Sequence, residues 1–294
     1  MRRMMLRNTG GAIPPQILNL FSGAGVACSL RLINNLYSGG LIRVRANDGT
    51  TNQGQADVLP HKIGSKYWVN LQSKLINLDV TATNRGLSTS STLADLVSAG
   101  NLNYNGFATT IYDQTLNGNH FIQNTAAKQG KIVNNGVLNQ ENGKPIILSL
   151  NGDTGYVSNF NPNGVNKSVF FVGKNAGVNS IILGTDIGAD DFVLVAQNNS
   201  TSSNITKNLI SLSYILNGLA KTFANRNEVF DETITQSLIN VNAEFDFNQN
   251  DLALGYRLVS SIFAMYSFQE MIFFNNQSDN LGKQNNINAA FLIY

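Results

Sequence analysis

The chain is poor in charge and in residues that build disulfides or metal sites. Only 13% of its 294 residues are Asp, Glu, Lys or Arg, and the formal net charge is +2. So small a surplus of positive charge argues against an electrostatic nucleic-acid binder. The single cysteine, Cys28, excludes an internal disulfide framework and a zinc cluster of thiolates. His61 and His120 are the only histidines. We therefore predict no metal ion and no cofactor.

Long apolar runs are also missing, since no stretch approaches the roughly 18 residues that a membrane-spanning helix needs. The basic start of the chain runs into Asn8 and Gly10 rather than an apolar segment, so we expect no Sec secretion signal. The hydrophobic content of 43% suffices to fill a core and argues against disorder.

Asparagine and glycine are abundant, with 43 Asn and 26 Gly against 5 Pro. Both residues tolerate positive φ, which tight hairpin turns require. Asn-Gly pairs begin at Asn105, Asn117, Asn135, Asn142, Asn151, Asn163 and Asn217. Short β-rich runs lie between these turns, for example residues 107–112, 168–173, 209–216 and 263–274. The pattern predicts an all-β fold, an antiparallel sandwich or jelly roll.

A few short helices interrupt this pattern. Apolar residues between Val26 and Tyr37 share one helical face, and Gly39-Gly40 ends that segment. A capping box at Thr92 and Asp95 predicts a short helix through residue 97. Ser278 is expected to cap a last helix at the end of the chain.

We expect one domain over residues 21–294, preceded by an N-terminal arm over residues 1–20. The arm carries Arg2, Arg3 and Arg7, and Pro14-Pro15 favours an extended backbone. Such an arm can order on a neighbouring protein, its arginines pairing with an acidic surface.

Several segments together resemble a known family. They are ACSLRL (27–32), LYSG (36–39), IRVR (42–45), GFATTIYDQ (106–114), NGNH (117–120) and QEMIFFN (269–275). In this order they resemble the catalytic domain of fungal α-L-arabinofuranosidase B, and still more the related domains of bacteriophage virion proteins. The resemblance covers most of residues 17–294. It implies a concanavalin A-like jelly-roll sandwich, with an insertion over about residues 52–104.

The segment from Asp113 to Asn119 has two interpretations. Asp113, Gln114, Asn117 and Asn119 could offer donors and acceptors to a sugar. The same side chains could instead satisfy the backbone of their own turn, which needs no ligand, and we favour this second interpretation. Trp68 is a further candidate for sugar binding, by stacking on a ring, or it could pack over the core.

Catalysis by a retaining glycosidase needs two carboxyl groups about 5 Å apart. The resemblance places the family's nucleophilic Glu at Gln197, and an amide cannot perform that step. The family's acid/base Asp would follow Gly255, where residues 256–259 hold no carboxylate. Asp190, Asp191 and Asp251 remain as nearby alternatives. Because the family's nucleophile and its acid/base residue both lack a carboxylate counterpart, the sequence predicts that the chain is not an enzyme and has no catalytic residues.

The predicted function is therefore that of a non-enzymatic bacteriophage virion protein: a head fibre, a capsid decoration or a tail-associated subunit. Its partners would be other virion proteins, reached through the arm, copies of itself in a trimer, and host-surface glycans. It would be located in the virion, assembled in the host cytoplasm. The alternative is an α-L-arabinofuranosidase-like glycoside hydrolase.

Overall fold

A computed structural model describes residues 16–149, 155–175, 179–185, 192–197, 199–203, 209–247, 251–254 and 266–294. Several predictions concern residues outside this set. They are the arm residues Arg2, Arg3 and Arg7, the alternative carboxylates Asp190 and Asp191, and the segment after Gly255.

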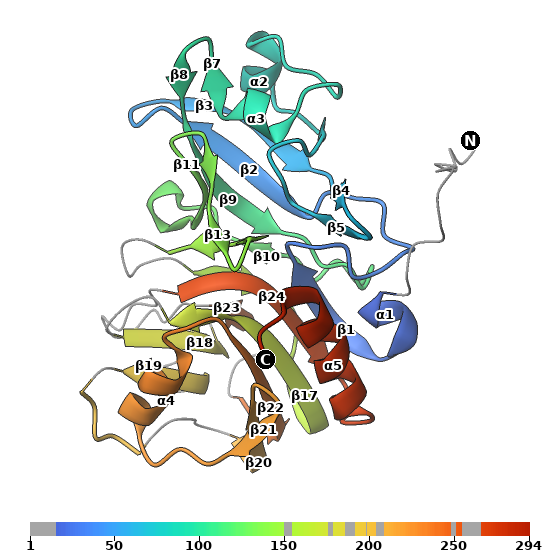
Figure 1. Ribbon diagram of the computed structural model, residues 1–294, viewed down its shortest axis with the longest axis vertical. Coiled ribbons are helices and arrows are strands. Elements are labelled where there is room, and N and C mark those ends of the chain that lie inside the picture. Colours follow the sequence, from blue (N-terminus) through green and yellow to red (C-terminus); the bar gives the residue numbers. More distant parts are fainter. Residues whose placement is uncertain are drawn as a thin grey trace.

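The predicted all-β sandwich is confirmed, because the described strands pair antiparallel and only a few short helices accompany them (Figure 1). Eighteen of these strands belong to one hydrogen-bonded network. In its first part the strands are β1 (Ala24–Ser29), β2 (Ile42–Asn47), β3 (Asn52–Val58), β6 (Leu75–Ile76), β9 (Asn105–Ile111), β10 (Phe121–Ile122), β11 (Lys131–Asn134), β12 (Val137–Leu138) and β15 (Ile147–Leu148). In its second part they are β16 (Tyr156–Ser158), β17 (Gly164–Asn175), β18 (Asn179–Thr185), β19 (Phe192–Gln197), β20 (Leu209–Leu216), β21 (Leu219–Lys221), β22 (Ser237–Phe245), β23 (Leu252–Leu254) and β24 (Tyr266–Phe274).

Shorter elements surround this network. Three hairpins pair β4 (His61–Ile63) with β5 (Lys66–Trp68), β7 (Ser98–Ala99) with β8 (Leu102–Asn103), and β13 (Gln140–Glu141) with β14 (Lys144–Pro145). The helices are α1 (Ile17–Leu20), α2 (Val80–Asn84), α3 (Leu93–Leu96), the 3₁₀ helix η1 (Ala126–Lys128), α4 (Arg226–Thr233) and α5 (Asn280–Phe291). Residues 52–104, the expected insertion, form β3 to β8 with α2 and α3, largely at the upper end of the molecule in Figure 1.

The strand β24 shows why a continuous apolar run folds as a strand here. It pairs with β17 along one side and with β1 and β15 on the other. Its successive side chains point to opposite faces of the sheet. Met271 and Phe273 enter the main core, whereas Ile272 and Phe274 enter a second cluster with Ile287 of α5. Because α5 covers the second face, both faces of β24 are buried.

The helix expected between Val26 and Tyr37 is wrong. The chain there forms β1, whose backbone pairs with β24. Val26 and Cys28 face the main core while Ala27 faces the second cluster, so the apolar residues follow a strand period. The physical cause is the pairing partner, which lies about 240 residues away along the chain and is invisible to a local pattern.

The other two predicted helices are confirmed. The Thr92 hydroxyl accepts from the N–H of Asp95, and the Asp95 carboxylate accepts from the N–H of Thr92 at 2.7 Å, a complete capping box on α3. The last helix, α5, is capped by Asp279 rather than by Ser278, since the Asp279 carboxylate accepts from the N–H of Gly282.

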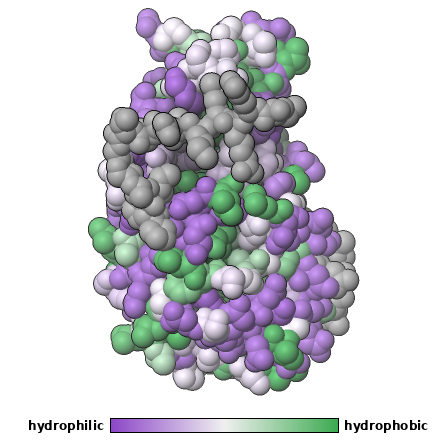
Figure 2. Space-filling model, turned by 90° about the vertical axis from the view of Figure 1, so that its right-hand side faces the viewer, coloured by the Kyte–Doolittle hydropathy of each residue, from purple (hydrophilic) through white to green (hydrophobic). Residues whose placement is uncertain are grey.

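The face on the side of α1 and α5 has apolar residues in small groups between polar ones (Figure 2). Ile17 of α1 is fully buried in the same cluster as Ile287 and Phe291 of α5. The expected boundary between residues 20 and 21 stays a prediction. No helix in the described ranges is long and apolar enough to span a membrane.

Helix α5 also buries a lysine, which gives a testable pH dependence. Lys283 is fully buried, its ammonium lies 4.2 Å from the centre of the Phe274 ring, and burial lowers its pKa from 10.5 to about 8. Between pH 8 and 10.5 the unfolded chain therefore holds a proton that the folded chain has released. The free energy of unfolding is expected to rise by about 2 kcal/mol across this range.

Lys283→Met removes the titrating group, and this rise should disappear from urea denaturation curves measured at pH 7.5, 9 and 10.5. The amide oxygens of Asn276 and Asn280 keep other donors, from Ser278 and Ser168, so the variant should fold. An unchanged pH dependence in the variant would contradict the assignment to Lys283.

Candidate functional site

The loop between β9 and β10 is organised around the carboxylate of Asp113. This side chain is buried and accepts hydrogen bonds from the N–H groups of Ala27, Thr115 and Asn119 at 2.9, 3.0 and 3.1 Å. The Thr115 hydroxyl adds a fourth donor at 2.7 Å. These bonds close the loop on itself and attach it to β1.

The other loop residues chosen from the sequence also bind the chain itself. Gln114 is fully buried; its amide oxygen accepts from the N–H of Ile33, and its amide nitrogen donates to the carbonyl of Arg31, both at 2.9 Å. The amides of Asn117 and Asn119 both donate to the carbonyl of Gly25, at 3.1 and 3.0 Å. Their proposed contact with a sugar stays a prediction.

Trp68, the remaining sugar-binding candidate, lies on β5 in the second cluster. Its indole is 3% exposed and meets the ring of Phe291 edge to face at 5.3 Å. Packing of this kind fits the core role that the sequence left open, and the sugar-stacking role stays a prediction.

A pocket of about 360 Å³ lies beside the Asp113 loop. Three polar lining residues come from separate segments: Tyr37 before β2, Asp57 on β3 and Asn77 after β6. Tyr112 and His120 belong to the loop between β9 and β10 itself. The loop contributes Asp113, Leu116 and Gly118 to the same lining. Sequence reasoning selected Asp113 from this lining but missed Tyr37, Asp57 and Asn77, because they lie far from the loop along the chain.

Asp57 is the centre of the pocket's polar contacts. One carboxylate oxygen accepts from Arg43 and from the Tyr112 hydroxyl, both at 2.7 Å, and the other accepts from the Asn77 amide at 2.7 Å. Asp57 is 4% exposed, so its charge is compensated by Arg43 within the fold. Burial, together with the bond to Asp57, raises the pKa of the Tyr112 hydroxyl, which therefore stays protonated.

His120 also lines the pocket, next to Tyr112. Its Nδ1 accepts from the backbone N–H of Asp113 at 3.0 Å, and its ring meets Tyr112 edge to face at 5.0 Å. Burial lowers the pKa of the imidazole, so the neutral form is favoured. The remaining ring nitrogen, Nε2, then carries the proton.

A second place of interest is the sheet end where β18, β19 and β23 meet. Gly184 of β18 pairs with Phe192 of β19, and Thr185 pairs with Leu252 of β23. Asp251, half-buried, immediately precedes Leu252. Gln197 lies at the other end of the same hairpin, paired with Asn179.

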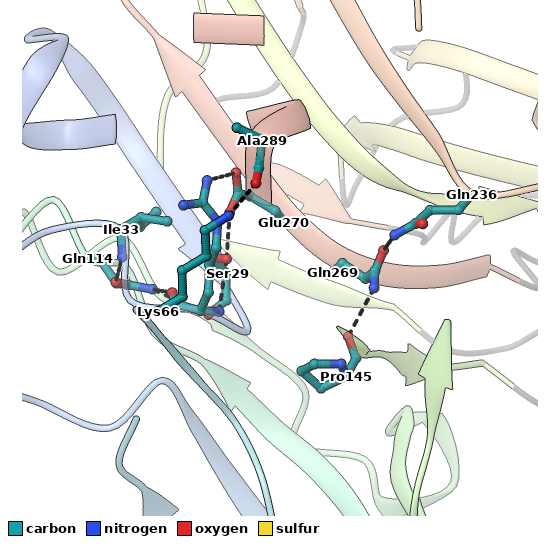
Figure 3. A network of polar contacts seen from close by, with 10 residues as sticks. Ser29, Ile33, Lys66, Gln114, Pro145, Gln236, Gln269, Glu270 and Ala289 are labelled. Carbon is teal, nitrogen blue, oxygen red and sulfur yellow. Dashed lines mark hydrogen bonds and ion pairs between the residues drawn. The ribbon is translucent and has the colours of Figure 1, made fainter. Parts of the chain in front are cut away.

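Close to β1 and β24 lies a buried ion pair that sequence reasoning did not select (Figure 3). Arg31 donates through Nε and Nη2 to the two carboxylate oxygens of Glu270, at 2.7 and 2.9 Å. The Ser29 hydroxyl donates to the same carboxylate at 2.7 Å, and Lys66 beside it donates to the carbonyl of Ala289. Both partners are almost fully buried, so the pair joins β1 to β24 rather than facing a ligand.

Within the described ranges, no three His, Cys, Asp or Glu side chains come together in a way that could hold a metal ion. Asp57, Asp113 and His120 line one pocket without forming such a group.

Neither a known protein family nor a curated protein matches the sequence. Among solved structures, an arabinofuranosidase in complex with arabinofuranosyl-α-1,2-xylobiose is similar, with a TM-score of 0.50 and 17% identity. The similarity covers 95% of this chain and 65% of that one. Two structures of a GH54 α-L-arabinofuranosidase, soaked with 4-nitrophenyl α-L-arabinofuranoside and with a cyclic sulfate inhibitor, have TM-scores of 0.49 and 0.46 at 16% and 15% identity. The chain thus shares the fold of an arabinofuranosidase while spanning less than two thirds of its length.

This finding corrects two predictions made from the sequence. The similar protein is an enzyme, which contradicts the assignment of a non-enzymatic virion subunit and favours the glycoside hydrolase alternative. The virion context finds no support among the matches. The assignment of the nucleophile position to Gln197 stays a prediction. Gln197 pairs with Asn179 at one end of the β18–β19 hairpin, whereas Asp251 precedes Leu252, which pairs with Thr185 at the other end.

Proposed function

We propose that this chain is a glycoside hydrolase of the α-L-arabinofuranosidase type, which cleaves α-L-arabinofuranosides. The observation that carries the proposal is the strand register around β18. It brings Asp251 beside the ends of β18 and β19, on a fold shared with an arabinofuranosidase bound to an arabinofuranosyl oligosaccharide.

The chemistry requires two carboxyl groups at one place. Asp251 supplies one carboxyl at this sheet end. The sequence between Thr185 and Phe192, outside the described residues, contains Asp186, Asp190 and Asp191. The strand ends that bound this segment pair with each other and with the residue after Asp251. The second carboxyl of the pair is therefore sought among these three aspartates.

The test is turnover of 4-nitrophenyl α-L-arabinofuranoside by the purified chain, followed as nitrophenolate release. We expect measurable turnover, and a decrease in kcat of about 100-fold in Asp251→Asn, the lower range for loss of an acid or base group. Asp246→Asn is the matched control, because Asp246 is an exposed aspartate in the same connection between β22 and β23.

Asp186→Asn, Asp190→Asn and Asp191→Asn, made singly, identify the second carboxyl as the one whose loss lowers kcat similarly. Absence of turnover in the wild-type chain, on this and on other aryl pentofuranosides, would contradict the proposed function. Equal rates in Asp251→Asn and Asp246→Asn would remove Asp251 from the site.

A further inference from the structure

The pocket beside the Asp113 loop is separate from the sheet end that carries Asp251. Its residues belong to the region of β2, β3 and β9, in the upper half of Figure 1, whereas β18 and β19 lie in the lower half. Ligand pockets commonly measure about 300–1,000 Å³, so a pocket of about 360 Å³ is at the small end and holds one small ring.

The hydrogen bonds around the pocket determine which of its side chains can accept a hydrogen bond from a ligand. A carboxylate only accepts, so the Tyr112 hydroxyl must direct its hydrogen to Asp57. The Tyr37 hydroxyl likewise donates to the carbonyl of Gly40, at 2.6 Å. Both phenolic oxygens therefore have only lone pairs left for a ligand. Asp57 adds acceptor capacity on the oxygen that Asn77 contacts, because a carboxylate oxygen can accept more than one bond.

His120 supplies a donor to the same lining. Since its Nδ1 accepts from the backbone, the neutral ring has its proton on Nε2. The pocket thus offers several acceptors, the fixed donor of His120 and the second N–H of the Asn77 amide. A matching ligand needs several O–H or N–H groups and at least one acceptor.

The charge of the residues that line the pocket further limits the kinds of ligand that can bind. All the lining residues are described, and none is Lys or Arg, while Asp57 and Asp113 both carry carboxylates. An anion such as phosphate or a sugar acid would meet these carboxylates without a cation on the lining to pair with. A metal ion lacks a third ligand. A neutral polyhydroxy ring meets both the hydrogen-bond and the charge requirements, and the rings of Tyr37, Tyr112 and His120 offer apolar faces to its C–H groups.

We infer that this pocket is a non-catalytic carbohydrate-binding site for one neutral sugar residue. The hydroxyl oxygens of Tyr37 and Tyr112 accept from sugar hydroxyls, and His120 Nε2 donates to a sugar oxygen. Catalysis is not its role, because the Asp57 carboxylate is bound to Arg43, Tyr112 and Asn77, and that of Asp113 holds the loop. The inference does not depend on the proposed hydrolase activity, since Asp251 takes no part in it.

The test is binding of L-arabinose and D-xylose to the full chain, measured by saturation-transfer NMR and by titration of ¹⁵N-labelled protein. We expect chemical-shift changes at His120, Tyr112 and Gly118. Tyr112→Phe removes one acceptor and should weaken binding about fivefold, as the loss of a single hydrogen bond predicts. Tyr67→Phe, a change of the same kind outside the lining, should bind like the wild type.

Two further variants test where the sugar binds, and two anionic probes test whether the site prefers neutral ligands. Ile76→Trp fills the pocket from its wall and should abolish binding, with folding checked by circular dichroism. Asp251→Asn should bind like the wild type, which separates this site from the proposed catalytic one. Inorganic phosphate and D-galacturonate should bind at least tenfold more weakly than the neutral sugars. The inference is overturned if no neutral sugar binds, if Ile76→Trp binds normally, or if the anions bind better.

Discussion

Replacing Glu270 by Gln is expected to lower the free energy of unfolding by about 3–5 kcal/mol, the cost of breaking a buried ion pair from one side. Arg31 would keep its charge at 3% exposure without a counter-charge, and Lys66 lies nearby as a second cation. The Ser29 hydroxyl would also face an amide, which need not present an acceptor to it. Urea denaturation at pH 7, followed by circular dichroism, measures the loss.

The control for this variant removes both charges together. Arg31→Met with Glu270→Leu leaves no unpaired ion, and replacing a buried pair by apolar side chains of similar volume is often neutral or stabilising. The double variant should therefore recover most of the lost stability. A double variant as unstable as Glu270→Gln would show that packing, rather than charge, dominates at this position.

Replacing Asp113 by Ala is expected to cost about 3 kcal/mol, because several donors lose their acceptor at once. Each buried donor left without a partner costs about 1–3 kcal/mol. The N–H of Ala27 is fully buried, whereas the donors of Thr115 and Asn119 can regain water as the loop opens. Faster amide exchange at Ala27 and Asn119 should accompany the loss of stability.

Asp48→Ala is the matched comparison for Asp113. Asp48 also accepts bonds from neighbouring backbone N–H groups and hydroxyls, those of Thr50 and Thr51, which lower its pKa. Its turn between β2 and β3 is exposed, so water can replace every bond it loses. A smaller effect there than at Asp113 is the expected result. Equal effects would show that burial of the Ala27 donor is unimportant.

The sequence predicts those parts of the fold whose cause is local. The Asn-Gly pairs that begin at Asn135, Asn142 and Asn217 form hairpin turns, whereas Asn105-Gly106 lies within β9. Thr92 with Asp95 identifies α3, because a capping box lies within four residues. It fails at β1, where the deciding interaction is pairing with β24. A window of a few residues cannot distinguish a strand period from a helix period when the apolar residues fit both.

In the candidate sites too, the sequence predicts the features with a local cause and misses those that depend on distant segments. Asp113 is recognisable from its turn chemistry, and His120 lies in the same loop, but Tyr37, Asp57 and Asn77 come from three other segments and meet the loop only in the folded chain. Likewise, the sequence alone does not show how Gln197 and Asp251 lie relative to one another. The register of β18 separates them to opposite ends of the β18–β19 hairpin.

The pairing of β1 with β24 also governs how the chain can reach its folded state. Two strands about 240 residues apart along the chain are immediate neighbours in the sheet, as the bond between Ser29 and Glu270 shows. Contacts of such high sequence separation close a very large loop, so they form late and slow the folding of β proteins. On a ribosome, β1 stays without this pairing partner until β24, about 240 residues later in the chain, has emerged. Until then, the apolar residues that β24 will cover remain exposed and can bind chaperones or another nascent chain.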